Sequence, residues 1–305
     1  MKAISAHQLC KAYGPTHALE HIDFDVEKGE IFGIIGPDGA GKTTLFRILT
    51  TLMLPDKGTA SIEGLDIRRD FKKIRRLIGY MPGRFSLYQD LTVEENLNFF
   101  ATLFGTTVEE NYHLIEDIYR QIEPFRHRRA GKLSGGMKQK LALSCALIHK
   151  PEVLFLDEPT TGVDPVSRKE FWEMLVRLRA QGISILVSTP YMDEAKLCDR
   201  IALIQNGRFL RIDTPEGIVA TFPYPLWAVQ AKEMHRLLTD LKEYPSTRSS
   251  YSFGNSFHVV LEPGTSPDRL KEHLLRQEHK DIAIKGIRPT VEDCFMLMLN
   301  EKENL

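Results

Sequence analysis

Short apolar runs alternate with amphipathic stretches over the first two thirds of the chain. The continuous runs at residues 31–35, 153–156 and 183–187 have no polar face, which is typical of strands buried on both sides. Apolar residues at helical spacing predict helices at residues 45–49, 92–103, 109–122, 141–148, 165–181 and 191–198. This alternation of strands and helices predicts an α/β fold.

Other segments alternate between apolar and polar positions, as strands with one exposed face do. Leu19, Ile22, Phe24 and Val26 are nearly alternate, so residues 1–35 are expected to form antiparallel strands that lead into the buried one. Further strands are predicted at residues 59–63, 77–81, 201–204 and 209–212, the last two joined by an Asn206-Gly207 turn.

Residues 223–225, a Pro-Tyr-Pro segment, mark a predicted boundary between a domain of residues 1–222 and one of 226–305. The second domain is predicted to contain strand, helix, two strands, helix and strand, at residues 226–231, 232–243, 247–253, 256–262, 267–277 and 281–287, before a last helix from Thr290. That order is the small α+β, ferredoxin-like fold. It has no cluster of ligand-type side chains, so a role in assembly or regulation and a structural cap both stay open.

Composition narrows the class of protein. The 305 residues are 42% hydrophobic and carry a net charge of −1, so no global field attracts nucleic acid or an anionic membrane. The four cysteines, Cys10, Cys145, Cys198 and Cys294, are scattered among apolar neighbours, which favours a reduced, intracellular protein. No signal peptide or membrane-spanning run is expected.

A phosphate-binding loop lies between the first buried strand and the helix at 45–49. It consists of Gly36, Pro37, Asp38, Gly39, Ala40, Gly41, Lys42, Thr43 and Thr44, in the spacing G-x-x-x-x-G-K-[ST]. The glycines let backbone N–H groups surround phosphate oxygens, and the helix presents its positive end to them. Lys42 is expected to reach the β- and γ-phosphates, Thr43 to bind Mg²⁺ and Thr44 to bind a nearby phosphate.

A second helix start has anion-binding character. Ser134, Gly135 and Gly136 follow Leu133 and directly precede the amphipathic run at 141–148. A second such site in a chain that already has a phosphate loop suggests nucleotides held between two copies of the fold. The alternative is an ordinary helix capped by Ser134.

Two acids end the buried strand at 153–156. Open α/β sheets place their chemistry at the carboxyl ends of strands, so Asp157 is expected to hold Mg²⁺. Glu158 could orient and deprotonate a water that attacks the γ-phosphate. Acids at a strand end can also serve as helix caps.

Three further stretches have two interpretations each. Tyr13 precedes a turn and could stack on a nucleotide base or be a core tyrosine. The basic run at 67–76 could follow a nucleic-acid backbone, but a solvated helix face is favoured because no aromatic platform accompanies it. The apolar loop at 82–88 is a plausible docking surface.

These motifs occur in the order found in ABC transporter ATPase subunits, which the chain resembles over about residues 3–220. The resemblance is carried by Tyr13, by the loop at 36–44 and by the segments at 133–137, 154–158 and 162–164. It implies an ABC ATPase domain of the P-loop NTPase class, with a RecA-like core, an antiparallel β subdomain and an α-helical signature subdomain.

The resemblance also implies ATP and Mg²⁺ as ligands and a second ABC ATPase domain as partner. In that family two domains meet head to tail. Each ATP then lies between one chain's phosphate loop and the other's signature residues, here Leu133, Ser134, Gly135 and Gly136, with Asp164 in the neighbouring loop. A residue at the place of Tyr13 stacks on adenine.

The tail favours one branch of the family. Residues 287–295 resemble the ending of ATPases that pair with ABC-2 type export permeases, which handle drugs, polysaccharides or lipids. The implied partners are integral-membrane permease subunits, in contact near Phe85, Leu87 and Tyr88, and no nucleic acid. The implied location is cytoplasmic, attached through the permease to the inner face of the cell membrane.

The sequence departs from the family at two positions. Gly83 stands where the family has glutamine, and Pro190 where it has the histidine that contacts the γ-phosphate. Losing one transition-state donor can lower turnover by about 10²–10³. We therefore expect slow turnover at this chain's own site, with its signature residues serving a competent site on a different ATPase chain.

Three alternatives stay open. A homodimer could tolerate both losses through Glu158 alone. A binding switch would close on ATP without hydrolysis. A soluble ABC protein acting on ribosomes or DNA is disfavoured, because such members usually have two ATPase domains in one chain or long coiled coils, and this chain has neither.

Overall fold

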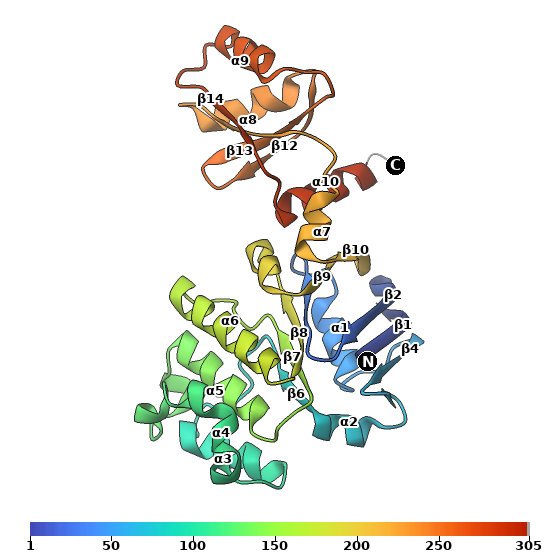
Figure 1. Ribbon diagram of the computed structural model, residues 1–305, viewed down its shortest axis with the longest axis vertical. Helices are drawn as coiled ribbons and strands as arrows, with labels where there is room; N and C mark the ends of the chain where they lie inside the picture. The colour runs from blue at the N-terminus through green and yellow to red at the C-terminus, as the bar shows by residue number, and fades with distance from the viewer. Residues whose placement is uncertain (304–305) are drawn as a thin grey trace. The chain divides into compact units, whose positions relative to one another are not determined.

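A computed structural model describes residues 1–303 and divides the chain into two compact units, Met1–Pro215 and Glu216–Leu305. The centre of the first unit is a six-stranded sheet in the order β10-β9-β3-β8-β7-β6 (Figure 1). Its strands are β3 (Ile31–Ile35), β6 (Ile78–Met81), β7 (Val153–Asp157), β8 (Ser184–Thr189), β9 (Arg200–Gln205) and β10 (Arg208–Asp213). All neighbours are parallel except β9 and β10, which form the predicted hairpin.

The three predicted buried runs are β3, β7 and β8, whose residues are all buried. Because parallel strands point the same way, their carboxyl ends meet at one edge of the sheet. The helix α1 (Lys42–Leu49) begins at that edge after β3, and α6 (Pro165–Ala180) follows β7. The predicted helix at 191–198 is a 3₁₀ helix instead, η3 (Met192–Leu197), in which the chain turns tightly after Pro190.

A helical region is inserted between β6 and β7. It consists of α3 (Val93–Leu103), α4 (Val108–Tyr119), η1 (Glu123–Phe125), η2 (Ala130–Lys132) and α5 (Gly135–Leu147). Thr92 and Thr107 each close a reciprocal capping box with a glutamate three residues later, so both helix starts are fixed locally. The helix predicted at residues 92–103 is therefore confirmed as α3, with Thr92 as its cap.

An antiparallel sheet in the order β2-β1-β4-β5 packs beside the central sheet. Its elements are β1 (Lys2–Tyr13), β2 (Thr16–Glu27), β4 (Lys57–Ile62) and β5 (Leu65–Asp66), followed by α2 (Phe71–Leu77). Phe24 of β2 lies 5.5 Å from Phe32 of β3 between ring centroids, within one shared core. The basic run at 67–76 lies mostly on α2, where Ile74 alone is buried, as expected of a solvated helix face.

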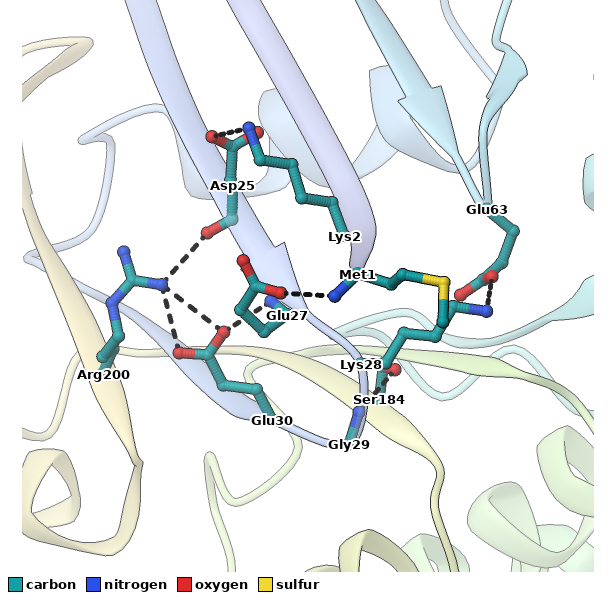
Figure 2. Close-up of polar contacts among 10 residues, drawn as sticks. All are labelled: Met1, Lys2, Asp25, Glu27, Lys28, Gly29, Glu30, Glu63, Ser184 and Arg200. Atoms are coloured by element: carbon teal, nitrogen blue, oxygen red, sulfur yellow. Dashed lines mark hydrogen bonds and ion pairs between the residues drawn. The ribbon is translucent and has the colours of Figure 1, made fainter.

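Polar contacts join the two sheets near the amino end of β3 (Figure 2). Arg200 of β9 pairs with the buried Glu30 at 3.3 Å, and the N–H of Gly29 donates to Ser184 Oγ at 3.0 Å. Burial raises the pKa of Glu30, although the N–H of Glu27 and the Arg200 guanidinium oppose this. Lys28 pairs with Glu63 in the same region.

The second unit contains a fully antiparallel sheet in the order β12-β13-β11-β14. Its elements are β11 (Leu226–Gln230), α8 (Met234–Glu243), β12 (Thr247–Phe253), β13 (Ser256–Leu261), α9 (Pro267–Arg276), β14 (Ala283–Ile287) and α10 (Val291–Glu303). This is the β-α-β-β-α-β order expected from the sequence, with α8 and α9 packed on β11 and β13 through one core. Residues 223–225 lie between α7 (Pro215–Ala220) and β11.

Asp293, in the tail that resembles export ATPases, is fully buried in this unit. Its carboxylate accepts from the N–H and hydroxyl of Thr290, both at 2.6 Å, and from the Tyr251 hydroxyl at 2.5 Å. Nδ1 of His258 lies 2.6 Å from it. Burial opposes ionisation of Asp293, but these hydrogen bonds lower its pKa overall, so the start of α10 is fixed to β12 and β13.

The four cysteines are free thiols, and all but the half-buried Cys10 are buried. Among residues 1–303, no helix is long and apolar enough to cross a membrane.

Candidate functional site

The loop from Gly36 to Gly41 joins β3 to α1 and needs its glycines for packing. A Cβ on Gly36 would lie 2.2 Å from the carbonyl oxygen of Ile204, and one on Gly41 would lie 2.3 Å from that of Ala18. Gly41 also has φ +106°, which disfavours any other residue. The loop therefore holds a backbone path with its N–H groups at the start of a helix, the geometry predicted for phosphate binding.

Lys42 is buried at the first turn of α1, with only 2% of its side chain exposed. Its Nζ donates to the carbonyl oxygens of Gly36 and Pro37, both at 2.8 Å, and lies 3.0 Å from Glu158 Oε1. Asp38 Oδ1 is 4.0 Å away on a side chain that is 89% exposed, so this carboxylate is directed largely to solvent. Thr43 and Thr44 follow Lys42 on α1 and are half-buried.

The two predicted acids meet at the end of β7 through Ser188 of β8. The Ser188 hydroxyl donates to Asp157 Oδ1 at 2.7 Å and accepts from the N–H of Glu158 at 3.0 Å. The same N–H lies 3.1 Å from the Ser188 carbonyl oxygen. Ser188 is a residue that sequence reasoning missed. One signal could have indicated it: Ser188 is a polar residue at the carboxyl end of a buried strand, and that strand is a neighbour of the one that ends in the acids.

Gly83 and Pro190, the departures from the family pattern, both lie in the loops that follow strands of this edge. A Cβ on Gly83 would be 3.0 Å from the carbonyl oxygen of Asp157 and 3.8 Å from Glu158 Cβ, so this position faces the acids. Pro190 follows Thr189, whose hydroxyl donates to the buried Glu194 at 2.5 Å. Neither residue has a side-chain donor.

Glu194 is a second residue that sequence reasoning missed. Its carboxylate also accepts from Thr160 at 2.8 Å and lies 3.6 Å from Arg168 Nε. Arg168 in turn stacks over the ring of Tyr191 at 3.9 Å. This cluster fixes the segment after β8. No spacing rule would have joined its residues, which come from β8, α6, η3 and the turn after β7.

The segment at Leu133 to Gly136 begins α5. Leu133 is buried, Ser134 and Gly135 are exposed, and the Ser134 hydroxyl accepts from the N–H of Met137 at 3.3 Å as a helix cap. The start of α6 lies beside it, since a Cβ on Gly136 would be 2.7 Å from Ser167 Oγ. Both interpretations of Ser134 remain compatible with this geometry.

Asp164 caps α6, accepting from the N–H groups of Val166 and Ser167 at 3.1 and 3.0 Å. The hydrogen bonds from Ser167 lower the pKa of Asp164, which keeps the carboxylate ionised. Two capped helix starts thus lie side by side at this surface.

Tyr13 ends β1 and is 45% exposed. Its hydroxyl donates to Met53 Sδ at 3.0 Å, and Lys11 Nζ lies 6.0 Å from the ring centroid. The ring is therefore accessible, as base stacking requires, and its orientation is held at the hydroxyl end.

A cavity of about 290 Å³ lies between the central sheet and the helical region. Leu87 lines it and is 7% exposed, whereas Tyr88 is 51% exposed and Phe85 is half-buried. Leu52 also lines the cavity and is 58% exposed. From the loop at 82–88, Pro82, Ser86 and Leu87 line the cavity.

Comparison with known proteins agrees with this geometry. The ABC transporter family profile matches residues 19–161. The probable multidrug ABC transporter ATP-binding protein YbhF of Escherichia coli (strain K12) is 42% identical over 92% of this chain and 49% of its own length. The chain thus spans about half of that relative.

Two shorter relatives match over most of their length. The Daunorubicin resistance ATP-binding protein DrrA2 of Streptomyces coeruleorubidus is 41% identical over 71% of this chain and 68% of its own. The Nod factor export ATP-binding protein I of Burkholderia lata is 39% identical over 68% and 70%. A solved structure of an ATP binding subunit of an ABC transporter superposes with a TM-score of 0.66 at 30% identity, over 72% of this chain and 93% of that one. The chain therefore belongs to the ATP-binding proteins of ABC transporters.

Proposed function

We propose that the chain binds and hydrolyses ATP as the ATP-binding subunit of an ABC-2 type export transporter. The observation that carries this proposal is the convergence of Lys42, Asp157 and Glu158 at one edge of the sheet, linked by the 3.0 Å ion pair and the Ser188 hydroxyl. In this proposal Lys42 and the N–H groups of the loop bind the phosphates. Glu158 orients the attacking water and accepts its proton.

The oxygen donors present fit Mg²⁺. Asp157 offers a carboxylate and Thr43 a hydroxyl, and Mg²⁺ in such sites takes one or two protein oxygens, with phosphates and waters for the rest. No group of three or more His, Cys, Asp or Glu side chains that could hold a metal ion occurs within residues 1–300. Bound Mg²⁺ would neutralise charge on the phosphates.

We further propose that the exposed Ser134 and Gly135, with Asp164, complete an ATP site on a second ABC ATPase domain. The start of α5 offers the N–H groups of Gly135 and Gly136 and the Ser134 hydroxyl at a surface, beside the start of α6 that Asp164 caps. A heterodimer is preferred because Gly83 and Pro190 lack the donors that a competent site needs. ATP at this chain's own loop would then turn over slowly and act mainly by closing the dimer.

The permease is proposed to dock over the cavity beside Leu87. An apolar hollow rimmed by exposed aromatic and aliphatic side chains suits a short helix of a membrane partner. Leu52 lines the hollow and is exposed. Phe100 also lines it and contacts the 40% exposed Phe99, whose ring in turn contacts that of Tyr88. Attachment through this face would hold the chain at the inner surface of the cell membrane.

The proposal is tested by ATP turnover of the purified chain alone and mixed with candidate partner ATPases. Glu158→Gln is introduced here, and the matching change is made separately in the partner. We expect most turnover to survive the change in this chain and to be lost with the change in the partner. The asymmetric assignment would be overturned if Glu158→Gln in this chain abolished all turnover while the matching change in the partner left turnover unchanged.

A binding switch without hydrolysis is the second candidate, favoured by the absence of side-chain donors at Gly83 and Pro190. It predicts ATP-dependent dimer closure with no phosphate release from any pairing. Membrane fractionation with and without a co-expressed permease then distinguishes a transporter subunit from a soluble ABC protein.

A further inference from the structure

The Ser188 side chain forms hydrogen bonds with both acids at the carboxyl end of β7. Its hydroxyl has a single proton, which is donated to Asp157 Oδ1 at 2.7 Å. The hydroxyl oxygen then accepts from the N–H of Glu158 at 3.0 Å, so the direction of both hydrogen bonds is fixed. Ser188 is fully buried, so bulk solvent does not reach its hydroxyl.

Glu158 depends on this support because of its backbone. Its φ of +51° lies in the left-handed region, which residues other than glycine rarely adopt. The N–H of Glu158 is held twice by Ser188, by the side chain at 3.0 Å and by the carbonyl oxygen at 3.1 Å. Such strain persists where the surroundings over-determine it, commonly at active sites.

The segment that carries Ser188 is itself fixed. Thr189 donates to Glu194 and accepts from the N–H of Tyr191 at 3.0 Å, and Pro190 has a constrained φ. Movement of β8 relative to the acids is thereby restricted at the next residue along the chain.

We propose that Ser188 is a positioning residue, whose hydroxyl aligns the Mg²⁺ carboxylate of Asp157 with the hydrolytic carboxylate of Glu158. This inference rests on the proposed function. It extends the proposed function by assigning the alignment of the two acids to one buried hydroxyl. Gly83 and Pro190 have no side-chain donor or acceptor that could take part in this alignment.

Ser184 provides a matched control on the same strand. It is 1% exposed, and its hydroxyl also accepts one backbone N–H at 3.0 Å, that of Gly29, but at the opposite end of β8 (Figure 2). Ser184→Ala therefore removes a buried hydroxyl of similar setting without touching either acid.

The experiment measures ATP binding to the intact 305-residue chain, with Mg²⁺ and with EDTA. We expect Ser188→Ala to weaken binding of Mg²⁺-ATP about 10-fold, the effect of one lost hydrogen bond to a charged group. Binding in EDTA should change less than about twofold. Ser188→Thr, which keeps the hydroxyl, should restore the Mg²⁺-dependent part, and Ser184→Ala should leave it unchanged.

Equal weakening with Mg²⁺ and with EDTA, or the same behaviour in Ser188→Ala and Ser184→Ala, would overturn the role of Ser188 while leaving the proposed function standing. Failure of the unaltered chain to bind Mg²⁺-ATP would overturn both. If Ser188→Ala does not fold, the same comparison is made with Ser188→Cys, which keeps a weaker donor and should show a smaller loss of the same kind.

Discussion

Nζ of Lys42 lies 3.0 Å from Oε1 of Glu158, so the cation of the phosphate loop and the acid after β7 are paired with each other. In the proposed function these groups serve different parts of ATP, the phosphates and the attacking water. ATP must therefore compete with Glu158 for Lys42, and the pair opposes nucleotide binding to some degree.

Glu158→Gln should tighten ATP binding at this chain's own phosphate loop while it lowers the slow turnover of that site alone. The change removes the ion-pair partner of Lys42 and one negative charge near the γ-phosphate, and a contact of this kind is worth about 1 kcal/mol, or about 5-fold in Kd. Equilibrium binding of Mg²⁺-ATP measures the effect. Glu173→Gln, which removes an exposed carboxylate of α6 outside the phosphate loop, is the control and should change Kd little. Weaker binding by Glu158→Gln would contradict the proposed competition.

Restoring the missing donors should accelerate the slow site. The double substitution Gly83→Gln with Pro190→His is expected to raise single-turnover hydrolysis by about 10²-fold, the value of one transition-state donor. Because a Cβ at Gly83 would lie 3.0 Å from the carbonyl oxygen of Asp157, Gly83→Ala measures the cost of that contact alone. The gain should vanish when Glu158→Gln is added. An unchanged rate in the double variant would mean that these positions do not limit turnover.

His149 should make folding stability depend on pH. It lines the cavity beside Leu87, its Nε2 is 2.9 Å from the Ile78 carbonyl oxygen, and its ring stacks on Phe104 at 3.7 Å. Burial lowers its pKa below the ordinary 6.5, although the hydrogen bond to Ile78 opposes this.

Below pH 6.5 the unfolded chain therefore binds a proton that the folded chain refuses, and the free energy of unfolding falls until the folded pKa is reached. The free energy of unfolding, measured with denaturant at several pH values in this range, should depend less steeply on pH in His149→Gln than in the unaltered chain. The exposed His113→Gln should leave the slope as it is. If the free energy of unfolding depended on pH equally steeply in both variants, the pH dependence could not be assigned to His149.

A charge on the rim of the cavity should disrupt permease docking. Leu52→Asp places a carboxylate where the proposed interface is apolar, and an unpaired buried charge should weaken association by about 10-fold or more. Co-sedimentation with permease-containing membranes measures it. Val176→Asp, on a 40% exposed residue of α6, is the control and should bind normally. Similar losses in both variants would argue against this docking face.

The fold was predictable where one local rule decides the structure. A few neighbouring residues are enough to predict the loop around Lys42 from its glycines, the helix start at Thr92 from its capping box, and β3 and β7 from their apolar runs. The contacts of Ser188 and Glu194 were not predictable, because they join strand ends that are neighbours only after the sheet has formed. The Lys42 to Glu158 pair spans more than a hundred residues, and no spacing in the sequence could indicate it.

The buried carboxylate of Asp293 changes how the tail motif should be understood. Its four hydrogen-bonding partners come from the motif itself and from two strands of the small domain. Deleting α10 would leave the buried His258 and the half-buried Tyr251 without their acceptor, and the domain would be expected to loosen. A tail-truncated protein that fails to assemble could therefore have either a damaged small domain or a missing contact surface. Single substitutions at exposed positions of the tail test the contact surface without damaging the domain.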